Sequence, residues 1–533
     1  MTNSSGSGDD GPGTEPMAGM VVPFVVVGAG PTGLTAATLL ARRGVGGVVL
    51  ESRPGPYPLP RAVHLDDEVL RILQRVGIAE EFSRVSTPAA GLRLVGPTLA
   101  TIAEFRRDRL VGEHGWPQAN MFDQPELERL LRENLASHPA VEVRYGIRFD
   151  GADQAPGGPA PVRVLLTDLA TGRTTILWTR AVLGCDGANS VVRAAIGARM
   201  RPSRFAERWL VVDVRCRRRL PRWNGVHQVC DPDAAATYMR VGAERYRWEF
   251  RLADGQTAAE VDVAARLAPW TGEVPVDELE IVRQAEYTFR AQVADRWRSG
   301  RVFLLGDAAH LTPPFIGQGL GSGLRDAANL TWKLDLVLAG RADERLLETY
   351  QSERRPHAIV VIGMAVAVGW LMTARHPAAR LVRRALPALA RPWLAARVLA
   401  TISPRLRRGP LVGRRRGDRL AGTMCPQPTI VKDGIERRLD DVLGDRFAVI
   451  HTRPLNEGLR AAVDAVEAYR LPVSADDALG RWLGRNRAAA AVVRPDRVVV
   501  VSVPEVVAGV PPAVATAGWS AWLTPGAPRG KWL

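Results

Sequence analysis

A glycine-rich turn near the N-terminus constrains the fold of this chain more than any other feature. Gly28-Ala-Gly30-Pro-Thr-Gly33 follows the apolar run Phe24–Val27 and precedes a stretch with apolar residues at helical spacing. A second apolar run, Val48–Leu50, ends in the acidic residue Glu51. This order of strand, glycine turn, helix, strand and acid predicts a βαβ unit that binds a dinucleotide.

Each glycine of the motif has a physical role in holding a pyrophosphate. Gly28 allows a tight turn, Gly30 leaves room for the phosphates, and Gly33 lets the helix and the strand approach closely. The helix N-terminus supplies partial positive charge. Glu51 stands where a carboxylate can accept hydrogen bonds from ribose hydroxyls. These residues leave open whether the dinucleotide is FAD or NAD.

Two further motifs place an aspartate directly after a predicted strand. Gly184-Cys-Asp186-Gly187 follows Ala181–Leu183, and Gly306-Asp307-Ala-Ala-His310 follows Val302–Leu305. For both aspartates two interpretations remain open, a cofactor contact or a helix cap. We expect His310 to pack behind the loop that carries Asp307. Together with the first motif, the downstream aspartate indicates a flavoenzyme.

The pattern along the chain predicts an α/β protein of several domains. Aromatic and β-branched clusters between about 205 and 290 indicate a sheet-rich domain inserted into the dinucleotide-binding domain. One helix is predicted from Asp67 to Gly77, and another begins at Pro125. The predicted organisation is a disordered tail over 1–20, a dinucleotide-binding domain over 21–200 and 291–400 with a helical region, a substrate domain over 201–290, a linker over 401–419, and a small α/β domain over 420–533.

The charge and the apolar stretches limit the classes of partner. The formal net charge of +15 comes almost entirely from arginine, because only Lys333, Lys432 and Lys531 are lysines among 71 basic residues. Scattered surface arginines explain it better than a nucleic-acid surface, since the basic runs are short and carry no interleaved aromatic residues. Ala358–Met372 is shorter than a bilayer span, so we expect a buried helix, with attachment to a membrane surface as the alternative.

The cysteines and the N-terminal segment bear on location and metal binding. Cys185, Cys216, Cys230 and Cys425 are spaced for neither a zinc site nor a dithiol pair, and no other cluster of metal ligands is visible. Residues 1–20 lack the basic start and apolar core of a secretory signal. We therefore predict a reducing, cytoplasmic location and no metal.

Several segments carry a family resemblance. Gly28–Gly33, Gly184–Gly187 and Gly306–Asn329 are similar to the three fingerprints of the single-component FAD-dependent aromatic hydroxylases, which share the p-hydroxybenzoate hydroxylase fold. The stretches that resemble the 3-(3-hydroxyphenyl)propionate hydroxylase branch are Pro60–Glu68, Gly115–Pro125, Cys230–Pro232, Gly317–Gly319 and Arg494–Arg497. The resemblance implies a Rossmann-like FAD-binding domain, an inserted sheet-rich substrate domain and a C-terminal thioredoxin-like domain without a CxxC pair.

The resemblance also implies cofactor roles for matched residues. Arg61 belongs to the pyrophosphate region, Gln124 to the vicinity of the flavin ring, and Asp186 to a motif tied to FAD and to the reduced nicotinamide. Asp307 would hold the ribityl hydroxyls. The expected cofactor-binding residues are Gly28, Gly30, Gly33, Glu51, Arg53, Arg61, Gln124, Asp186, Asp307, Pro314, Gly319 and Leu320, the last three flanking the isoalloxazine.

Two residues are candidates for catalysis, and one position departs from the family pattern. His64 and Asp66 fall on the stretch that faces the flavin in the family, where substrate contact or proton relay competes with a structural or flavin-contact role. Gly321 stands where the branch usually has Asn. We therefore expect one side-chain hydrogen bond to the pyrimidine edge of the flavin to be missing.

The resemblance implies a monooxygenase. NADPH or NADH would reduce FAD, a C4a-hydroperoxyflavin would form with O2, and one oxygen atom would pass to a phenolic or polycyclic aromatic substrate. Catabolism and the tailoring or inactivation of an aromatic natural product, such as an antibiotic, fit equally. A flavin dehydrogenase that does not activate O2 and a basic flavin-containing binder are the alternatives. We expect a small aromatic substrate and O2 as partners, no nucleic acid, no stable membrane insertion, and a homodimer.

Overall fold

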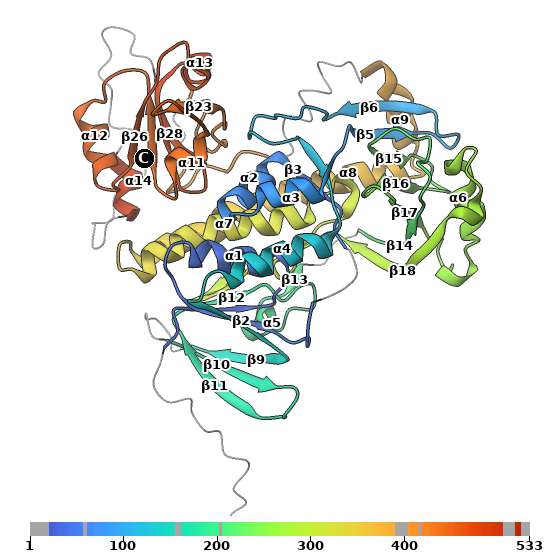
Figure 1. Cartoon of the computed structure of the whole chain (residues 1–533), viewed down its shortest axis with the longest axis horizontal. Helices are drawn as coiled ribbons and strands as arrows, with labels where there is room; N and C mark the ends of the chain where they lie inside the picture. The colour runs from blue at the N-terminus through green and yellow to red at the C-terminus, as the bar shows by residue number, and fades with distance from the viewer. Residues whose placement is uncertain are drawn as a thin grey trace, which may run out of the picture.

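A six-stranded, mostly parallel sheet forms the centre of the computed structural model (Figure 1). The structure describes residues 21–56, 61–154, 161–201, 205–389, 403–413, 417–504 and 517–523, so the predicted disordered tail lies outside the described residues. The strands, in spatial order, are β20 (Arg298–Ser299), β21 (Val302–Leu304), β12 (Val182–Gly184), β1 (Phe24–Val27), β2 (Gly47–Glu51) and β8 (Val141–Tyr145). Strand β1 is apolar and fully buried, as a central parallel strand covered on both faces must be.

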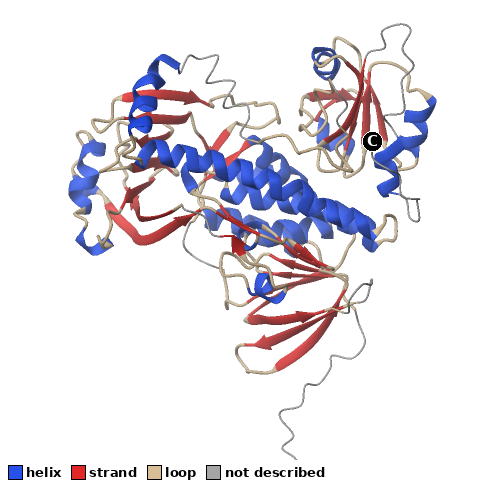
Figure 2. Cartoon of the chain, turned by 180° about the vertical axis from the view of Figure 1, so that it is seen from behind, coloured by secondary structure: helices blue, strands red, loops and turns tan. Residues whose placement is uncertain are grey.

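Helices cover one face of this sheet and a small antiparallel sheet covers the other (Figure 1). The helices are α1 (Pro31–Ala41), α4 (Gln124–Ala136) and α7 (Gly319–Leu338), and Figure 2 shows the long helices stacked together above the strands. The small sheet consists of β9 (Ile147–Asp153), β10 (Val162–Asp168) and β11 (Thr174–Thr179). The predicted βαβ unit is therefore confirmed, with α1 as its crossover helix.

Helix α2 (Asp67–Val76) follows the predicted boundaries because both of its ends are capped. Asp66 accepts a hydrogen bond from the Val69 amide at the N-terminus, and Gly77 ends the helix with a φ of 101°. Helix α3 (Ala79–Val85) comes next, and the strands β3 (His64–Asp66), β4 (Thr87–Pro88) and β7 (Ala119–Met121) form a short sheet beside it.

A seven-stranded sheet forms the second domain and includes strands from the first part of the chain. Its spatial order is β18 (Glu280–Arg290), β14 (Ala206–Arg215), β17 (Arg245–Arg251), β16 (Ala236–Arg240), β15 (Val226–Val229), β5 (Gly91–Val95) and β6 (Thr101–Arg106). The predicted range 201–290 omits β5 and β6. Helix α6 (Val263–Thr271) packs on one face, and the smaller elements between the two domains are α5 (Val191–Ala195), β13 (Met200–Arg201), β19 (Gln292–Ala294) and β22 (His310–Leu311).

Two consecutive helices follow α7. Helix α8 (Glu348–Thr373) contains the apolar stretch noted in the sequence, and α9 (Pro377–Leu389) comes after it. Among the described residues, one helical stretch, Glu344–Thr373, is long and apolar enough by length and composition to cross a membrane. Half of its most apolar window is buried within the protein, which is also typical of a core helix.

The C-terminal unit is a small α/β fold. Its sheet has the order β26 (Tyr469–Pro472), β25 (Ala448–His451), β27 (Ala488–Val493) and β28 (Val499–Pro504), with β26 parallel to β25 and the other pairs antiparallel. The remaining elements are the hairpin β23 (Thr429–Lys432) and β24 (Ile435–Arg438) and the helices α11 (Leu439–Leu443), α12 (Glu457–Asp464), α13 (Ala478–Arg485) and α14 (Ala517–Ser520). This βαβ unit followed by a hairpin is compatible with the thioredoxin-like prediction, which stays a prediction.

Buried ion pairs join the C-terminal unit to the helices of the first domain. Arg71 of α2 donates to both oxygens of Asp440, at 2.8 and 2.7 Å. Arg494 and Lys333 contact the Glu353 carboxylate of α8 at 2.8 and 2.9 Å. Because these charges are almost fully buried, each one needs its ion-pair partner to replace the water that it has lost.

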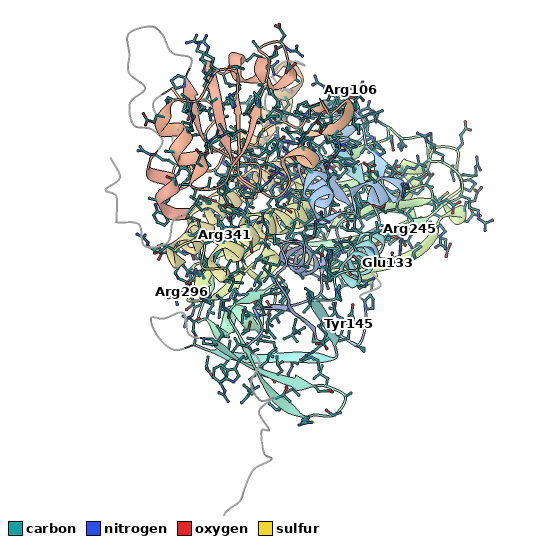
Figure 3. All side chains as sticks on the ribbon, turned by 60° about the vertical axis from the view of Figure 1, so that its left-hand side comes forward. Arg106, Glu133, Tyr145, Arg245, Arg296 and Arg341 are labelled. Carbon is teal, nitrogen blue, oxygen red and sulfur yellow. The ribbon has the colours of Figure 1, made fainter. Side chains whose placement is uncertain are left out.

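Arginines elsewhere are spread over the surface. Arg106, Arg245, Arg296 and Arg341 lie apart from one another in the molecule (Figure 3). Three of them pair with a nearby carboxylate: Arg106 with Asp108, Arg245 with Asp123, and Arg341 with Glu467. This distribution favours a solvated surface over a single basic binding face.

Candidate functional site

Two adjoining cavities form a groove between the central sheet, the N-terminus of α7 and the seven-stranded sheet. The larger has a volume of about 620 Å³, within the range of ligand sites, and the smaller about 80 Å³. They share Gly30, Pro31, Arg61 and Gln124 in their walls. One extended molecule can therefore occupy both.

The glycine turn shapes the junction between the cavities. A Cβ at Gly28, whose φ is 103°, would lie 2.5 Å from the Cys185 carbonyl, and one at Gly33 would lie 2.0 Å from the Gly28 carbonyl. In contrast, a Cβ at Gly30 would meet nothing within 4 Å. The first two glycines thus permit close backbone packing, and Gly30 leaves open space at the start of α1, which suits a pyrophosphate.

Glu51 and Arg53 line the small cavity. The two oxygens of Glu51 accept hydrogen bonds from the Ala29 and Arg53 amides, each at 3.0 Å. The carboxylate is therefore held at the end of β2 with further lone pairs for ribose hydroxyls. Glu51 and Arg53, both predicted to bind the cofactor, therefore lie in the wall of the groove.

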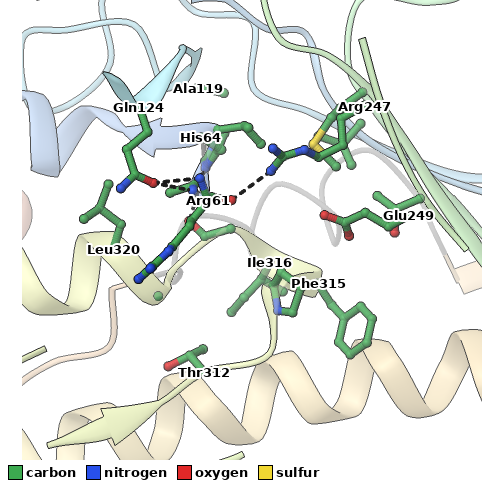
Figure 4. A pocket seen from close by; sticks show the side chains of 18 of the residues that line it. Arg61, His64, Ala119, Gln124, Arg247, Glu249, Thr312, Phe315, Ile316 and Leu320 are labelled. Atoms are coloured by element: carbon green, nitrogen blue, oxygen red, sulfur yellow. Dashed lines mark hydrogen bonds between the residues drawn. The ribbon is translucent and has the colours of Figure 1, made fainter. Parts of the chain in front are cut away.

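Gln124 fixes the backbone that carries Arg61. Its Oε1 accepts hydrogen bonds from the amides of Arg61 and Ala62 at 3.0 and 2.7 Å (Figure 4). Its Nε2 donates to Glu128 at 2.8 Å. Arg61 lines both cavities, where its charge suits a phosphate. Gln124 thus acts through backbone geometry as well as by lining the groove.

Asp307 faces the large cavity from a single helical turn, Gly306–Ala308. Burial in the protein raises the pKa of its carboxyl, while the charges of His310 and Arg61 act to lower it. The side chain is nevertheless open to the cavity, so a ligand there can reach it. This is the arrangement expected for a contact with the ribityl hydroxyls.

Asp326 of α7 anchors this turn and was not singled out from the sequence. Its Oδ2 accepts a hydrogen bond from the Gly306 amide at 3.1 Å and lies 2.7 Å from His310 Nε2, while its Oδ1 pairs with Arg354 at 2.8 Å. His310 also stacks on Trp297 with ring centroids 5.1 Å apart. His310 therefore packs behind the turn, as expected.

The N-terminus of α7 forms another wall of the large cavity. Pro314, Gly319 and Leu320 all line it, and Gln318 gives the helix no side-chain cap. The first N–H groups of a helix have no partner within the helix and carry partial positive charge. They can therefore stabilise negative charge on a bound ring, as predicted for the pyrimidine edge of a flavin.

Gly321 does not line the cavity, in contrast to what its comparison with the family suggests. A Cβ there would lie 2.9 Å from Arg325 Nη1 and 3.0 Å from Val69 Cγ2. A side chain at this position would therefore extend toward Arg325 and Val69. The geometry gives no support to a missing side-chain contact with the flavin.

His64 and Asp66 have different environments despite their closeness in sequence. His64 lines the large cavity with Nδ1 3.5 Å from the Gly317 carbonyl, and burial lowers its pKa to about 4. Asp66 caps α2 and pairs with Arg325 at 2.7 Å, which holds its pKa below the ordinary value despite burial. His64 is therefore a neutral group at the site, whereas Asp66 is not among the residues that line the cavity.

Asp186 lies before the N-cap residue of α5, Ser190, and adds a second side-chain bond to the start of this helix. Its Oδ2 accepts a hydrogen bond from the Val192 amide at 3.0 Å at the start of α5. Burial raises its pKa, and Oδ1 has no hydrogen-bond partner among the described residues. Its neighbours Cys185 and Gly187 line the large cavity, but Asp186 does not. The structure thus favours the helix-cap interpretation, with one oxygen still unpaired.

The part of the cavity beyond the flavin position is walled by residues that the sequence did not identify. Arg247 of β17 pairs with Asp213 at 2.7 Å and donates to the Arg61 carbonyl at 2.8 Å (Figure 4). Glu249, two residues along the same strand, has a pKa raised to about 7 by burial. The apolar lining includes Met239, Phe315, Ile316, Met364, Ala367 and Val368.

The residues present fit FAD. The small cavity carries the acid for a ribose, the junction carries Gly30 and Arg61 for phosphates, and the large cavity carries Asp307 and the α7 N-terminus for a ribityl chain and a flavin ring. Space remains beside the seven-stranded sheet for a second small molecule. Among the described residues, no group of three or more His, Cys, Asp or Glu side chains is placed to hold a metal ion.

Comparisons with known proteins agree with this geometry. The family model described as FAD binding domain matches residues 21–365. The chain is 35% identical over 495 residues to a probable NADH-specific resorcinol 4-hydroxylase of Rhodococcus jostii (strain RHA1), covering 89% of this chain and 91% of that protein. It is 35% identical over 515 residues to a 3-(3-hydroxy-phenyl)propionate/3-hydroxycinnamic acid hydroxylase of Burkholderia cenocepacia (strain HI2424), covering 89% and 92%.

A solved structure matches over nearly the whole chain. It is OxyS anhydrotetracycline hydroxylase from Streptomyces rimosus, with a TM-score of 0.74 and 26% sequence identity. The match covers 91% of this chain and 96% of that chain. The similarity therefore extends beyond the first domain and includes the C-terminal unit.

Proposed function

The chain belongs to the single-component FAD-dependent aromatic hydroxylases, and we propose that it hydroxylates a one-ring phenol, with NADH as reductant and O2 as the oxygen source. Bound FAD supplies the acceptor for hydride and the site of O2 activation. The protein orients the phenol, excludes water and stabilises the charge on the reduced ring.

One observation carries the proposal: the groove that fits FAD continues into a cavity beside the seven-stranded sheet. Apolar side chains such as Phe315, Met364 and Val368 line this space together with a few polar groups. A flat apolar molecule with a hydroxyl group matches such a lining. The two hydroxylases at 35% identity are named for one-ring phenols, which supports the same size of substrate here.

The proposed reductant rests on the name of one relative. The relative from Rhodococcus is named as NADH-specific, and we extend that preference to this chain. Catabolism of the phenol is the role that these relatives support best. A cytoplasmic location and a homodimer stay predictions. Cell fractionation and sedimentation of the FAD-loaded protein test them.

A rate measurement tests the proposed function. The FAD-loaded protein should oxidise NADH slowly alone and much faster with resorcinol, with one hydroxylated product formed for each NADH consumed. NADPH should be a poorer reductant under the same conditions. If no phenol in a broad panel raises the rate and no hydroxylated product forms, the flavin dehydrogenase alternative is favoured.

A further inference from the structure

We propose that Glu249, Thr237 and Gln228 form a specificity-determining subsite that binds hydroxyl groups of an uncharged phenol and disfavours a substrate that carries a carboxylate. This polar row, as we call these three residues, rests on the proposed function and adds the chemical class of the substrate.

The polar row crosses three neighbouring strands of the seven-stranded sheet. Glu249 of β17 pairs in register with Thr237 of β16, and Thr237 pairs with Gln228 of β15. Directly paired residues in a sheet point to the same face. All three line the large cavity, and Figure 4 shows the Glu249 side chain directed into the space beside Ile316.

The row offers hydrogen-bonding groups that the protein itself does not use. Exposed fractions are only 6% for Glu249, 3% for Thr237 and 1% for Gln228. Gln228 Nε2 donates to the Phe315 carbonyl, yet its Oε1 and the Thr237 Oγ1 have no partner among the described residues. No hydrogen bond to the Glu249 carboxylate occurs within the described part of the chain either. Buried polar atoms are normally paired, so two unpaired buried atoms beside a carboxylate on one cavity wall indicate a ligand.

The chemistry of the row selects hydrogen-bond donors. A carboxylate only accepts, an amide oxygen only accepts, and a hydroxyl can do either. Phenolic O–H groups can therefore pair with all three positions. A substrate carboxylate has no hydrogen to offer, so it cannot pair with the Glu249 carboxylate or with the Gln228 amide oxygen.

The arginines nearest the row lie beside other carboxylates. Arg247 on the same strand and Arg283 of β18 share Asp213, at 2.7 and 3.7 Å, and Arg107, which also lines the cavity, lies 3.6 Å from Asp67. His64 across the cavity is uncharged, because burial lowers its pKa to about 4. Glu249 takes part in no ion pair among the described residues, so once it is ionised the row itself carries a negative charge. In a buried site that charge repels an anion strongly.

A pair of ligands that differ only in charge tests the subsite. The ligands are 3-(3-hydroxyphenyl)propionate and its uncharged amide, titrated into the FAD-loaded protein at pH 8 while the flavin absorbance is followed. This pH ionises both Glu249 and Asp67, since burial raises each pKa to about 7. The wild type should bind the amide at least about tenfold more tightly than the acid.

Three variants test whether the polar row causes the preference for the amide over the acid. Glu249→Gln should bring the two affinities to within about threefold of each other, because the repelling charge is gone. Glu280→Gln, an exposed glutamate on β18 of the same sheet, should keep the wild-type ratio. Thr237→Val should weaken resorcinol about five- to tenfold, as expected for a lost hydrogen bond, while leaving the ratio of amide to acid unchanged.

Each contrary result has a distinct meaning. Equal binding of acid and amide by the wild type, or an unchanged ratio in Glu249→Gln, overturns the subsite while leaving the proposed function intact. If Glu249→Gln fails to retain FAD, unaltered resorcinol binding by Thr237→Val overturns the row independently. If the FAD-loaded wild type binds no phenol at all, the proposed function fails and the subsite fails with it.

Discussion

Asp326 Oδ2 lies 2.7 Å from His310 Nε2, and the same oxygen accepts a hydrogen bond from the Gly306 amide. Asp326 belongs to α7, whose N-terminus forms the flavin-facing wall, and Gly306 begins the turn that carries Asp307. One carboxylate thus joins two walls of the cofactor groove. This contact ties the turn that carries Asp307 to α7.

Asp326→Asn should weaken FAD binding and also lower the melting temperature of the FAD-free protein. An amide retains only part of the hydrogen bonding and leaves Arg354 without its buried charge partner. Removing one partner of a buried pair commonly costs about 3–5 kcal/mol. Asp335→Asn, further along the same helix, is the matched control. Unchanged melting temperature and FAD content would show that the contact does not hold the turn.

Asp307→Ala should lose FAD without the loss of stability expected for Asp326→Asn, because its carboxylate faces the cavity. One charge-assisted hydrogen bond is worth roughly 1.5–3 kcal/mol, or about ten- to a hundredfold in affinity. Equilibrium dialysis of FAD gives the dissociation constant, and calorimetry of the FAD-free protein gives stability. Stoichiometric FAD retained in the purified variant would exclude the assigned role.

Much of the first domain could be predicted because its signals are local. The strand Phe24–Val27, the glycine turn and the helix cap at Asp66 each depend on residues adjacent in sequence. The C-terminal unit was harder. Strand β27 has the sequence AAAAVV, and alanine favours helices unless sheet neighbours bury it, so local sequence does not indicate this strand.

The cofactor end of the site was visible in the sequence, and the substrate end was not. Glu51, Arg61 and Asp307 follow motifs with fixed spacing and line the groove. The polar row comes from three strands, and its residues meet only through strand register. One signal was present: Arg247 and Glu249 alternate with aromatic residues in β17, which places two charges on one face of a buried strand.

Glu249→Gln should stabilise the substrate-free protein much more at pH 8 than at pH 5. Burial raises the folded-state pKa of Glu249 to about 7, so between its ordinary pKa of 4.5 and 7 the folded state binds more protons than the unfolded state. Stability therefore falls as pH rises through this window. The full difference corresponds to at most about 3 kcal/mol. Denaturant unfolding at both pH values measures it, and an equal offset at pH 5 and pH 8 would contradict the assignment.

Asp440→Asn should destabilise the whole chain, because Asp440 joins Arg71 of α2 to Arg497 of the C-terminal unit within a buried cluster. The two arginines hold its pKa below the ordinary value, so the loss should be full at neutral pH and should diminish as pH falls below about 4. Asp441→Asn is the control, since Asp441 is exposed and bonds only Gln74 among the described contacts. Equal melting temperatures for the two variants would refute the docking role.

Incorporation of labelled oxygen tests the central claim most directly. The FAD-loaded protein, NADH and resorcinol are incubated under ¹⁸O2 in unlabelled water, and the products are analysed by mass spectrometry. The account predicts one ¹⁸O atom in each molecule of hydroxylated phenol. Label found only in water or hydrogen peroxide, with no labelled phenol from resorcinol or from a broad phenol panel, would contradict it.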